Sequence, residues 1–308
     1  MSLAAEIRER ARELGFDAVG IAPAALPSRY GAFLDRWLSR GRHGEMGWMA
    51  RAPHRRKDPR EILPGAKSVI SLAMNYYPGE HGPARAGHGK VARYAWGRDY
   101  HALIEQKLDA LADWLHEREP GAGIKRYVDH GPVLERAVAQ EAGVGFIGKN
   151  TMLITERFGS WVFLAELITT LELAPDRPQT SQCGSCRLCL DACPTGAIVA
   201  PYELDATRCI SYLTIELKRE LAESEQRMIG NWAFGCDVCQ EVCPYNHPPT
   251  TTEVPAFQQG AGPWIDLAST AAMQSDDEMA RFAGTPLTRP GRAGLARNAR
   301  VVAAGSVP

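Results

Sequence analysis

The spacing of the cysteines constrains the fold of this 308-residue chain more than any other feature. All eight cysteines lie between Cys183 and Cys243. The segment 183–194, CGSCRLCLDACP, spaces four of them two, two and three residues apart and ends in proline. Such a run holds iron–sulfur cubes, and its cysteine before proline binds the neighbouring cluster. The segment 236–244, CDVCQEVCP, repeats half of this run, which predicts a second cluster.

The eight cysteines divide into two complete ligand sets of the bacterial ferredoxin kind. Cys209 is separated from the later run by an insert of 26 residues. We assign two [4Fe–4S] clusters, one to Cys183, Cys186, Cys189 and Cys243 and the other to Cys193, Cys209, Cys236 and Cys239. Paired C-x2-C units also form tetrahedral zinc sites, which is the alternative. Zinc sites seldom show three cysteines at two-residue intervals and a fourth before proline, so the spacing favours iron and sulfur.

Composition points to a soluble protein that works inside the cell. Hydrophobic residues make up 45% of the chain, and the net charge is −1, so no global basic field attracts nucleic acid. The first residues form a charged amphipathic helix rather than a signal peptide, and no apolar run reaches about eighteen residues. We therefore expect a cytoplasmic protein without membrane contact, in which cysteines serve as metal ligands more often than as disulfides.

Hydrophobic periodicity predicts an α/β domain before the cysteines. We expect helices at 3–14, 100–118 and 132–143, and strands at 17–22, 66–77, 125–129, 150–154 and 160–171. Pro132 is expected at the first position of its helix. The proline-rich stretch 174–182 indicates a boundary. The predicted organisation is an α/β domain at 1–175, a ferredoxin-like module at 176–250 and a C-terminal segment at 251–308.

The glycine-rich segment 143–150, GVGFIGKN, is a weak candidate for a phosphate loop. It lacks the Walker spacing, and it does not open a helix after a strand. We interpret it as a helix end followed by turns.

Several long motifs closely resemble the epoxyqueuosine reductase family. They are 127–154 (YVDHGPVLERAVAQEAGVGFIGKNTMLI), 209–218 (CISYLTIELK), 93–101 (RYAWGRDYH) and 58–70 (DPREILPGAKSVI), and the similarity covers nearly all of residues 1–300. The resemblance implies a nitroreductase-like α/β domain that binds cobalamin, joined to the double [4Fe–4S] module. It also implies an oxidoreductase for the last step of queuosine biosynthesis. In that step the epoxide of epoxyqueuosine, at the wobble position of tRNA, becomes the alkene of queuosine, with cob(I/II)alamin fed by the two clusters.

Asp129 is the candidate catalytic residue. It stands at the end of a predicted strand, where a carboxylic acid near the cobalt can protonate the departing epoxide oxygen. The proton donor of the family aligns with Asp129, whereas a helix cap before Pro132 is the structural alternative. His101 begins a helix in our interpretation, because Ile104 stands where the base-off cobalamin motif D-x-H-x-x-G needs glycine.

The resemblance also suggests residues that contact the cofactor. Asn150, Thr151 and Met152 follow the glycine-rich segment, and Ser211 and Tyr212 follow the cluster ligand Cys209. The full set of candidate cobalamin contacts is Arg56, Tyr94, Asp129, Asn150, Thr151, Met152, Ser211 and Tyr212. For each of them ordinary turn or packing chemistry is the alternative.

The expected partners are the tRNA substrate and an electron donor that the sequence does not identify. Basic segments at 51–60, at Lys218–Arg219 and from Arg281 onward are candidate phosphate contacts, and we expect a monomer. Many family members continue past this point into helical repeats, so we expect this chain to be either a short or a truncated form. Two other functions remain open: a corrinoid reductase of the reductive dehalogenase kind acting on a small molecule, although no twin-arginine export signal is present, and an electron-transfer iron–sulfur protein.

Overall fold

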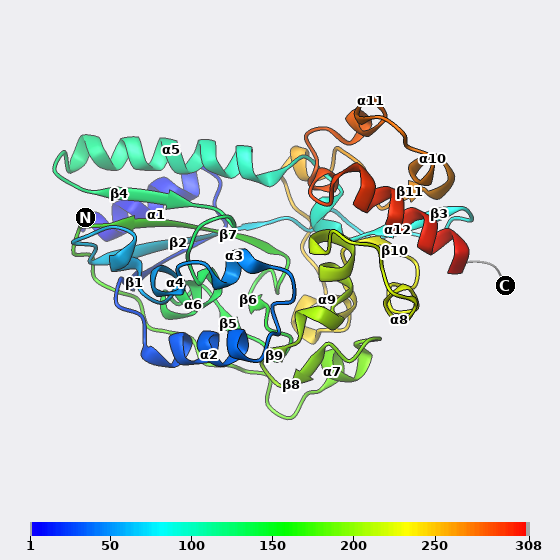
Figure 1. The fold of residues 1–308 in the computed structure, drawn as a ribbon. Helices are drawn as coiled ribbons and strands as arrows, with labels where there is room; N and C mark the ends of the chain where they lie inside the picture. Colours follow the sequence, from blue (N-terminus) through cyan, green and yellow to red (C-terminus); the bar gives the residue numbers. More distant parts are fainter. Residues whose placement is uncertain (1, 306–308) are drawn as a thin grey trace. The chain divides into compact units, whose positions relative to one another are not determined.

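Two compact units interleave along the chain in the computed structural model, which describes residues 2–305 (Figure 1). The first unit contains residues 2–41, Trp48–Asn75 and His101–Cys186. The second contains Arg42–Gly47, Tyr76–Tyr100 and 187–305. This division differs from the consecutive domains expected at 1–175, 176–250 and 251–308, since residues 76–100 pack with the cysteine-rich part. Those boundaries stay a prediction about functional modules.

The first unit is built on an antiparallel four-stranded sheet. Its strands follow the order β1 (Ala18–Pro23), β2 (Ser68–Asn75), β7 (Val162–Thr169) and β4 (Ile124–Tyr127). Both central strands, β2 and β7, are almost completely buried, which explains their continuous apolar sequences. With helices on this sheet, the unit has the mixed α/β fold that periodicity predicted.

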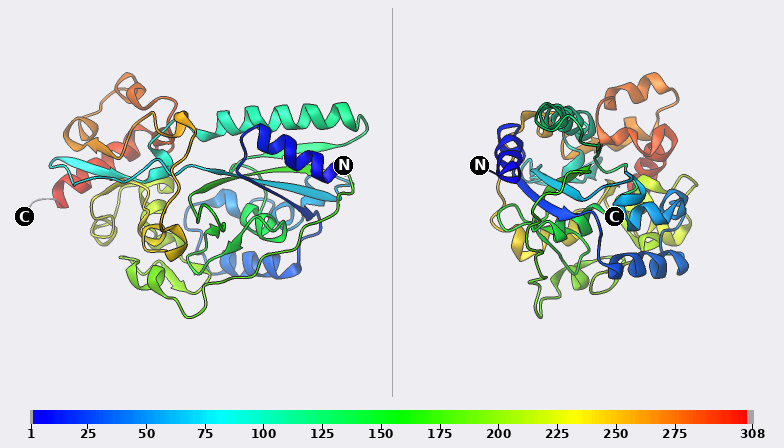
Figure 2. Two further views of the ribbon diagram at one scale, coloured as in Figure 1. Left: turned by 180° about the vertical axis from the view of Figure 1, so that it is seen from behind. Right: turned by 90° about the vertical axis from the view of Figure 1, so that its left-hand side faces the viewer.

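Helices cover both faces of this sheet (Figures 1 and 2). Helices α1 (Leu3–Glu13) and α5 (Tyr100–Arg118) lie on one face, and α6 (Glu135–Glu141) lies on the other. Val138 of α6 packs with Val69 and Ile168 of the sheet, and each such buried side chain contributes about 1.5–3 kcal/mol. Gly20 of β1 permits this close approach, because a Cβ there would collide with the Ala142 carbonyl.

Most expected elements of the first unit are confirmed, and three differ in detail. The helix at 100–118 matches α5. The helix expected at 132–143 begins at Glu135 instead, because residues 130–133 bend, so Pro132 is not its first residue. The strand expected at 150–154 shrinks to β6 (Leu153–Ile154), which pairs with β5 (Phe146–Ile147) across a turn. Strand β4 ends at Tyr127, so Asp129 lies beyond it rather than at its last position.

The second unit contains a three-stranded sheet and the cysteine-rich segments. The sheet has the order β10 (Trp232–Phe234), β3 (His88–Val91) and β11 (Trp264–Asp266), and β8 (Ile198–Ala200) pairs with β9 (Glu203–Leu204). Short helices α7 (Leu188–Ala192) and α9 (Val238–Glu241) lie within the two cysteine runs, and a π-helical turn, Tyr212–Glu216, follows Cys209. The remaining α-helices are α2 (Ser28–Ser39), α3 (Gly47–Ala50), α4 (Pro53–Lys57), α8 (Glu223–Gln226), α10 (Leu267–Ala271), α11 (Asp276–Met279) and α12 (Gly291–Gly305).

Helix α12 supports the segment that follows Cys209. The Arg297 guanidinium is only 1% exposed and donates to the carbonyl oxygens of Leu213 and Leu217, each at 2.8 Å. The Asn298 amide donates to the Thr214 carbonyl at 2.7 Å. These bonds satisfy carbonyl groups that the π-helical turn leaves unpaired. Within residues 2–305, no helix is long and apolar enough to cross a membrane.

Candidate functional site

Asp129 stands on a tight turn between β4 and α6. Its φ is +57°, in the left-handed region, which aspartate tolerates better than most residues. The Asp129 N–H donates to Oε1 of Glu135 at 2.6 Å, which anchors the turn to the first residue of α6. Its carboxylate is 61% exposed, and its Oδ2 lies 3.7 Å from Nε2 of His101. The chain therefore presents this carboxylate outward from a backbone held in place.

Two glutamates, the partly exposed Glu135 and the buried Glu166, influence each other's charge near this turn. Glu166, on the central strand β7, is completely buried and stands between Ser71 of β2 and Tyr127 of β4. Burial, reinforced by the Asp129 charge, raises the pKa of Glu135 to about 8. Burial and the Glu135 carboxyl raise the pKa of Glu166 well above its ordinary value. The pair therefore retains a proton at neutral pH.

Arg56 joins the same region from α4. Its Nη1 donates to the Gly131 carbonyl at 3.2 Å, two residues beyond Asp129, and its guanidinium lies 5.4 Å from the Trp48 ring centre. Burial lowers the Arg56 pKa, and the Glu135 charge opposes that shift. Its buried Nε has no hydrogen-bond partner among the described residues. The structure thus brings Arg56 and Asp129, both predicted site residues, to one turn.

The turn between β5 and β6 contains the three predicted residues Asn150, Thr151 and Met152. The Asn150 Oδ1 accepts from the Met152 N–H at 3.1 Å, and Thr151 is left-handed with a φ of +68°. The Thr151 carbonyl accepts from Nη1 of Arg136 at 2.9 Å. Helix α6 therefore contacts two candidate segments, the Asp129 turn through Glu135 and this turn through Arg136.

Lys149 connects the β5–β6 turn to the first cysteines. Its N–H donates to Sγ of Cys183 at 3.5 Å. Its Nζ donates to the carbonyl oxygens of Gly184 at 2.6 Å and Cys186 at 2.8 Å. A positive charge and an N–H···S bond beside thiolate ligands are the kind of outer contact that orients ligands and tunes a metal centre.

Four cysteines of the second unit lie close enough to influence one another. Burial raises the pKa values of Cys209, Cys236 and Cys239, and the neighbouring thiols among Cys193, Cys209 and Cys236 raise them further. The N–H of Ala197 donates to Sγ of Cys193 at 3.2 Å. Four partly exposed thiols that influence one another's charge are a donor set that a metal cluster would stabilise.

Ser211 and Tyr212 follow Cys209 at the start of the π-helical turn. The Ser211 hydroxyl and the N–H groups of both residues hydrogen-bond the Cys209 sulfur. The Tyr212 hydroxyl accepts from the Glu45 N–H at 2.8 Å. Tyr94, the remaining candidate contact, packs against Tyr100 and Phe234 with ring centres 6.5 and 5.9 Å away. Within the second unit, Ser211 and Tyr212 therefore support the ligand Cys209, and Tyr94 packs against other aromatic rings.

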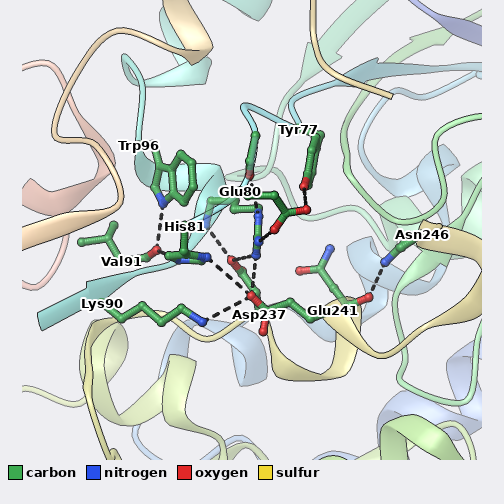
Figure 3. Close-up of polar contacts among 12 residues, drawn as sticks. Tyr77, Glu80, His81, Lys90, Val91, Trp96, Asp237, Glu241 and Asn246 are labelled. Carbon is green, nitrogen blue, oxygen red and sulfur yellow. Dashed lines mark hydrogen bonds and ion pairs between the residues drawn. The ribbon is translucent and has the colours of Figure 1, made fainter. Parts of the chain in front are cut away.

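Figure 3 shows a network of charges around Asp237 and Glu241. The Asp237 charge also acts on Cys236 and Cys239. His81, Asp237 and Glu241 each offer a ligand atom within 4.8 Å of the others, as in a small metal site. Nη1 of Arg93 lies 2.6 Å from Glu241 and 3.2 Å from Asp237, and Nζ of Lys90 lies 3.3 Å from Glu241. These side chains already supply the positive charge that a cation would bring, so we interpret the group as an ion-pair network.

Sequence reasoning missed several residues that build this region. Glu135 and Glu166 support the Asp129 turn, Arg136 supports the β5–β6 turn, and Arg93 compensates Asp237. A signal was present for Glu166, because it is a single acid within the otherwise apolar run VFLAELIT. A lone charge in a buried strand is rare unless it has a function or a partner.

The basic segments carry less free charge than their sequences suggest. In 51–60, Arg56 is buried, while Lys57 and Arg60 form ion pairs with Asp35 and Asp58. After residue 280, Arg297 is buried, and Arg289, Arg292 and Arg300 form ion pairs with Glu216, Asp276 and Glu220. Lys218 donates to the Arg289 carbonyl, and Arg219 pairs with Glu225. Arg51 and Arg55 are exposed.

Two family models match the chain at the segments described above. Residues 56–130, from Arg56 to just past Asp129, match a model described as epoxyqueuosine reductase QueG, DUF1730. Residues 182–246, which contain all eight cysteines, match a model described as a 4Fe-4S double cluster binding domain.

Relatives of similar length are known in sequence and in structure. The epoxyqueuosine reductase of Gloeobacter violaceus is 44% identical over 305 residues, covering 96% of this chain and 94% of that protein. A crystal structure of epoxyqueuosine reductase with an epoxyqueuosine-modified tRNA-Tyr stem loop superposes with a TM-score of 0.92 at 35% identity, covering 98% of this chain and 81% of that one. A structure of the Bacillus subtilis epoxyqueuosine reductase shows its catalytic aspartate loop swung out of the active site. It superposes with a TM-score of 0.91 at 34% identity and covers 98% of this chain and 81% of that one.

Proposed function

Because the chain belongs to the epoxyqueuosine reductase family and is an oxidoreductase, we propose that it reduces the epoxide of epoxyqueuosine in tRNA to the alkene of queuosine. The observation that carries this proposal is the Asp129 turn. A left-handed aspartate, exposed at its carboxylate and anchored at its N–H, lies between a β-strand and a helix. Its place in the chain corresponds to the proton donor of the family, and one relative is described by its catalytic aspartate loop.

The donor groups of the chain suit the cofactors of the family. We propose that Cys193, Cys209, Cys236 and Cys239 hold one [4Fe–4S] cluster and that Cys183, Cys186, Cys189 and Cys243 hold the other. The mutual influence of the first four thiols supports the first assignment. The clusters would pass single electrons.

We also propose that the chain binds cobalamin. The buried, unpartnered Nε of Arg56 beside the Asp129 turn suits an amide or phosphate acceptor of a large cofactor. Residues proposed to contact it are Arg56, Tyr94, Asp129, Asn150, Thr151, Met152, Ser211 and Tyr212. When bound, cobalamin supplies the low-potential cobalt chemistry that delivers electrons to the epoxide.

Asp129 would supply a proton to the oxygen that leaves the ring. Conversion of the epoxide to the alkene takes up two electrons and two protons and releases one water molecule. An exposed carboxylic acid on a fixed turn can come within hydrogen-bonding reach of that oxygen. The backbone anchor at Glu135 limits where the acid can point.

The remaining partners follow from this substrate. We propose that tRNA phosphates are contacted by exposed arginines of the 51–60 segment, Arg51 and Arg55, rather than by the paired arginines near the end of the chain. A separate electron donor must reduce the clusters. We further propose a cytoplasmic monomer, in keeping with a tRNA substrate.

The test is an anaerobic conversion assay. Protein reconstituted with iron, sulfide and cobalamin receives a chemical reductant and tRNA that contains epoxyqueuosine, and digestion with mass spectrometry detects queuosine. We expect conversion by the native chain and a loss of about 100-fold or more with Asp129→Asn. Asp113→Asn, an exposed aspartate on α5, is the matched control and should convert normally. If Asp129→Asn kept its cofactor spectra and still converted epoxyqueuosine at the native rate, Asp129 would not be the proton donor.

A further inference from the structure

The large apolar side chains that are exposed within residues 2–305 all lie in the cysteine-rich part of the second unit. They are Leu188, Val199, Tyr202 and Tyr245, which are 51%, 38%, 38% and 36% exposed. Leu188 stands between the proposed cluster ligands Cys186 and Cys189. Single exposed apolar side chains need no explanation, but exposed side chains that gather in one short part of a chain indicate a site of contact with another molecule.

The elements that carry three of these side chains pack together. Helix α7, which contains Leu188, packs against β8, which contains Val199. Strand β8 pairs with β9 across the turn that contains Tyr202, and Figure 1 shows α7 beside this hairpin. All three elements belong to the second unit. Leu188, Val199 and Tyr202 therefore form one apolar surface next to the first cysteine run.

Tyr202 is not the residue that its backbone favours. Its φ is +67°, in the left-handed region, and it follows Pro201 at the tip of the β8–β9 hairpin. A turn with proline at its second position and a left-handed third residue ordinarily has glycine there. The fold buries the Tyr202 ring only in part. Tyrosine is common where proteins meet, because its ring is apolar and its hydroxyl tolerates water.

The charges near this surface are paired with one another. Arg187 and Asp191 of the first cysteine run form an exposed ion pair at 3.4 Å. Glu203, next to Tyr202, forms an ion pair with Arg42. Nucleic acid is held mainly by cations that are free to meet phosphates. The surface therefore suits a protein partner better than tRNA.

The size of the surface suits a brief encounter. A stable protein interface has about 20 to 30 residues on each side, whereas electron-transfer partners meet through smaller contacts. Three apolar side chains on α7 and one hairpin are of the smaller kind. The cysteines of the adjoining run, Cys186, Cys189 and Cys193, are partly exposed. A partner that covers this surface would thus lie close to ligands of a centre that passes single electrons.

We propose that Leu188, Val199 and Tyr202 form the docking surface for the electron donor, a small protein that carries one electron at a time. This inference rests on the proposed function, which requires a separate donor. In each encounter the carrier is oxidised by one electron and a cluster is reduced by one, and no bond forms or breaks. Two encounters supply the two electrons that one epoxide takes up.

The test measures how fast the clusters are reduced, without any epoxyqueuosine. Anaerobic protein reconstituted with iron, sulfide and cobalamin is mixed with a reduced [2Fe–2S] ferredoxin or a reduced flavodoxin, and freeze-quenching with EPR spectroscopy follows the reduced clusters. We expect at least one carrier to reduce the native protein. Tyr202→Gly and Val199→Ser should slow that reduction by about tenfold. Dithionite, a small reductant that needs no docking surface, should reduce native protein and variants equally fast.

Two controls separate docking from folding. Glycine suits the left-handed backbone at position 202, so Tyr202→Gly should unfold at a urea concentration at least as high as the native protein does. Val301→Ser changes a partly exposed valine of α12 in the same unit and should keep the native rate with the carrier. Each variant should also retain the native iron content.

Several outcomes would overturn the inference. These are native carrier-driven rates in both Tyr202→Gly and Val199→Ser, and a native protein that neither carrier reduces. A weaker affinity of Tyr202→Gly for tRNA would assign the surface to tRNA, and a native dimer that Tyr202→Gly dissociates would assign it to a second copy of the chain. If the carrier results are as expected but epoxyqueuosine is not converted with a chemical reductant, the proposed function fails and the docking surface serves another reduction.

Discussion

The two units of the molecule hold acidic side chains in opposite surroundings. In the first unit, Glu135 and Glu166 face each other without a cation in direct contact, and their pKa values rise. In the second unit, Glu241 is surrounded by Arg93, Lys90 and His81. Burial alone would raise the Glu241 pKa, but contacts with His81 and Arg93 lower it well below its ordinary value.

The comparison shows that the partner, rather than the burial, decides what a buried acid does. Asp237 illustrates the balance, because burial raises its pKa while Arg93 opposes the rise. The second network lies beside Cys236 and Cys239, where fixed, compensated charge suits a site that only passes electrons. The first pair lies under Asp129, where a bound proton is useful for chemistry.

Removing the central cation of the second unit should produce the largest effect. Arg93→Met leaves Asp237 and Glu241 buried without their main partner, which costs about 3–5 kcal/mol. Urea unfolding of the anaerobically reconstituted protein measures the shift. Arg219→Met, which breaks an exposed ion pair with Glu225, should cost at most about 1 kcal/mol. Equal losses of unfolding free energy in the two variants would mean that Arg93 does not stabilise the charges of Asp237 and Glu241.

The acid pair of the first unit should make stability depend on pH. The folded pKa of Glu135 is about 8 and its ordinary value is 4.5, so between these values the folded state binds a proton that the unfolded state lacks. The contribution is fully present below pH 4.5 and is lost as pH rises through 8. The slope is about 1.4 kcal/mol per pH unit for one proton.

This pH dependence is measured by unfolding the native protein and Glu135→Gln at several pH values. The free energy of unfolding of the native protein should fall with rising pH more steeply than that of the variant. Glu241→Gln should not flatten the curve in this range, because the Glu241 carboxylate is already ionised there. Parallel curves for the native protein and Glu135→Gln would show that the pair binds no extra proton.

A smaller effect is expected at Lys149, a cation of the first unit that contacts the carbonyl oxygens of Gly184 and Cys186 rather than the acid pair. Lys149→Met removes two hydrogen bonds, to Gly184 and Cys186, and should speed iron loss to a chelator by several-fold. Iron and sulfide analysis over time measures the loss. Lys125→Met, on the exposed side of β4, is the control and should behave like the native protein. Equal rates in both variants would leave Lys149 without a role at the cluster.

Features that depend on local sequence could be predicted, whereas features that depend on long-range packing could not. The spacing of Cys183 to Cys193 and the periodicity of α5 are local, and both indicated the correct kind of element. Residues 76–100 pack with the cysteine-rich part, which no local pattern reveals. The intramolecular partners of the basic segment after residue 280 could not be foreseen for the same reason, because those of Arg297 and Arg289 lie about 70 to 85 residues away in sequence.

The site shows the same division. Asp129 was identified through the family motif, but its left-handed backbone and its anchor at Glu135 depend on a helix that begins three residues later than its pattern suggests. The pairing of Glu135 with Glu166 requires the strand order of an antiparallel sheet, which the sequence leaves undetermined.

The most direct test of the central claim is an infrared titration of the tRNA-free protein, since a protonated carboxyl group has its own stretching band. At neutral pH the native protein should show this band, and the band should disappear as pH rises through about 8. Glu135→Gln should lack the titrating band, whereas Glu241→Gln should keep it. A native protein without such a band, or a band that is lost in Glu241→Gln and kept in Glu135→Gln, would contradict the assignment of the stored proton to the first unit.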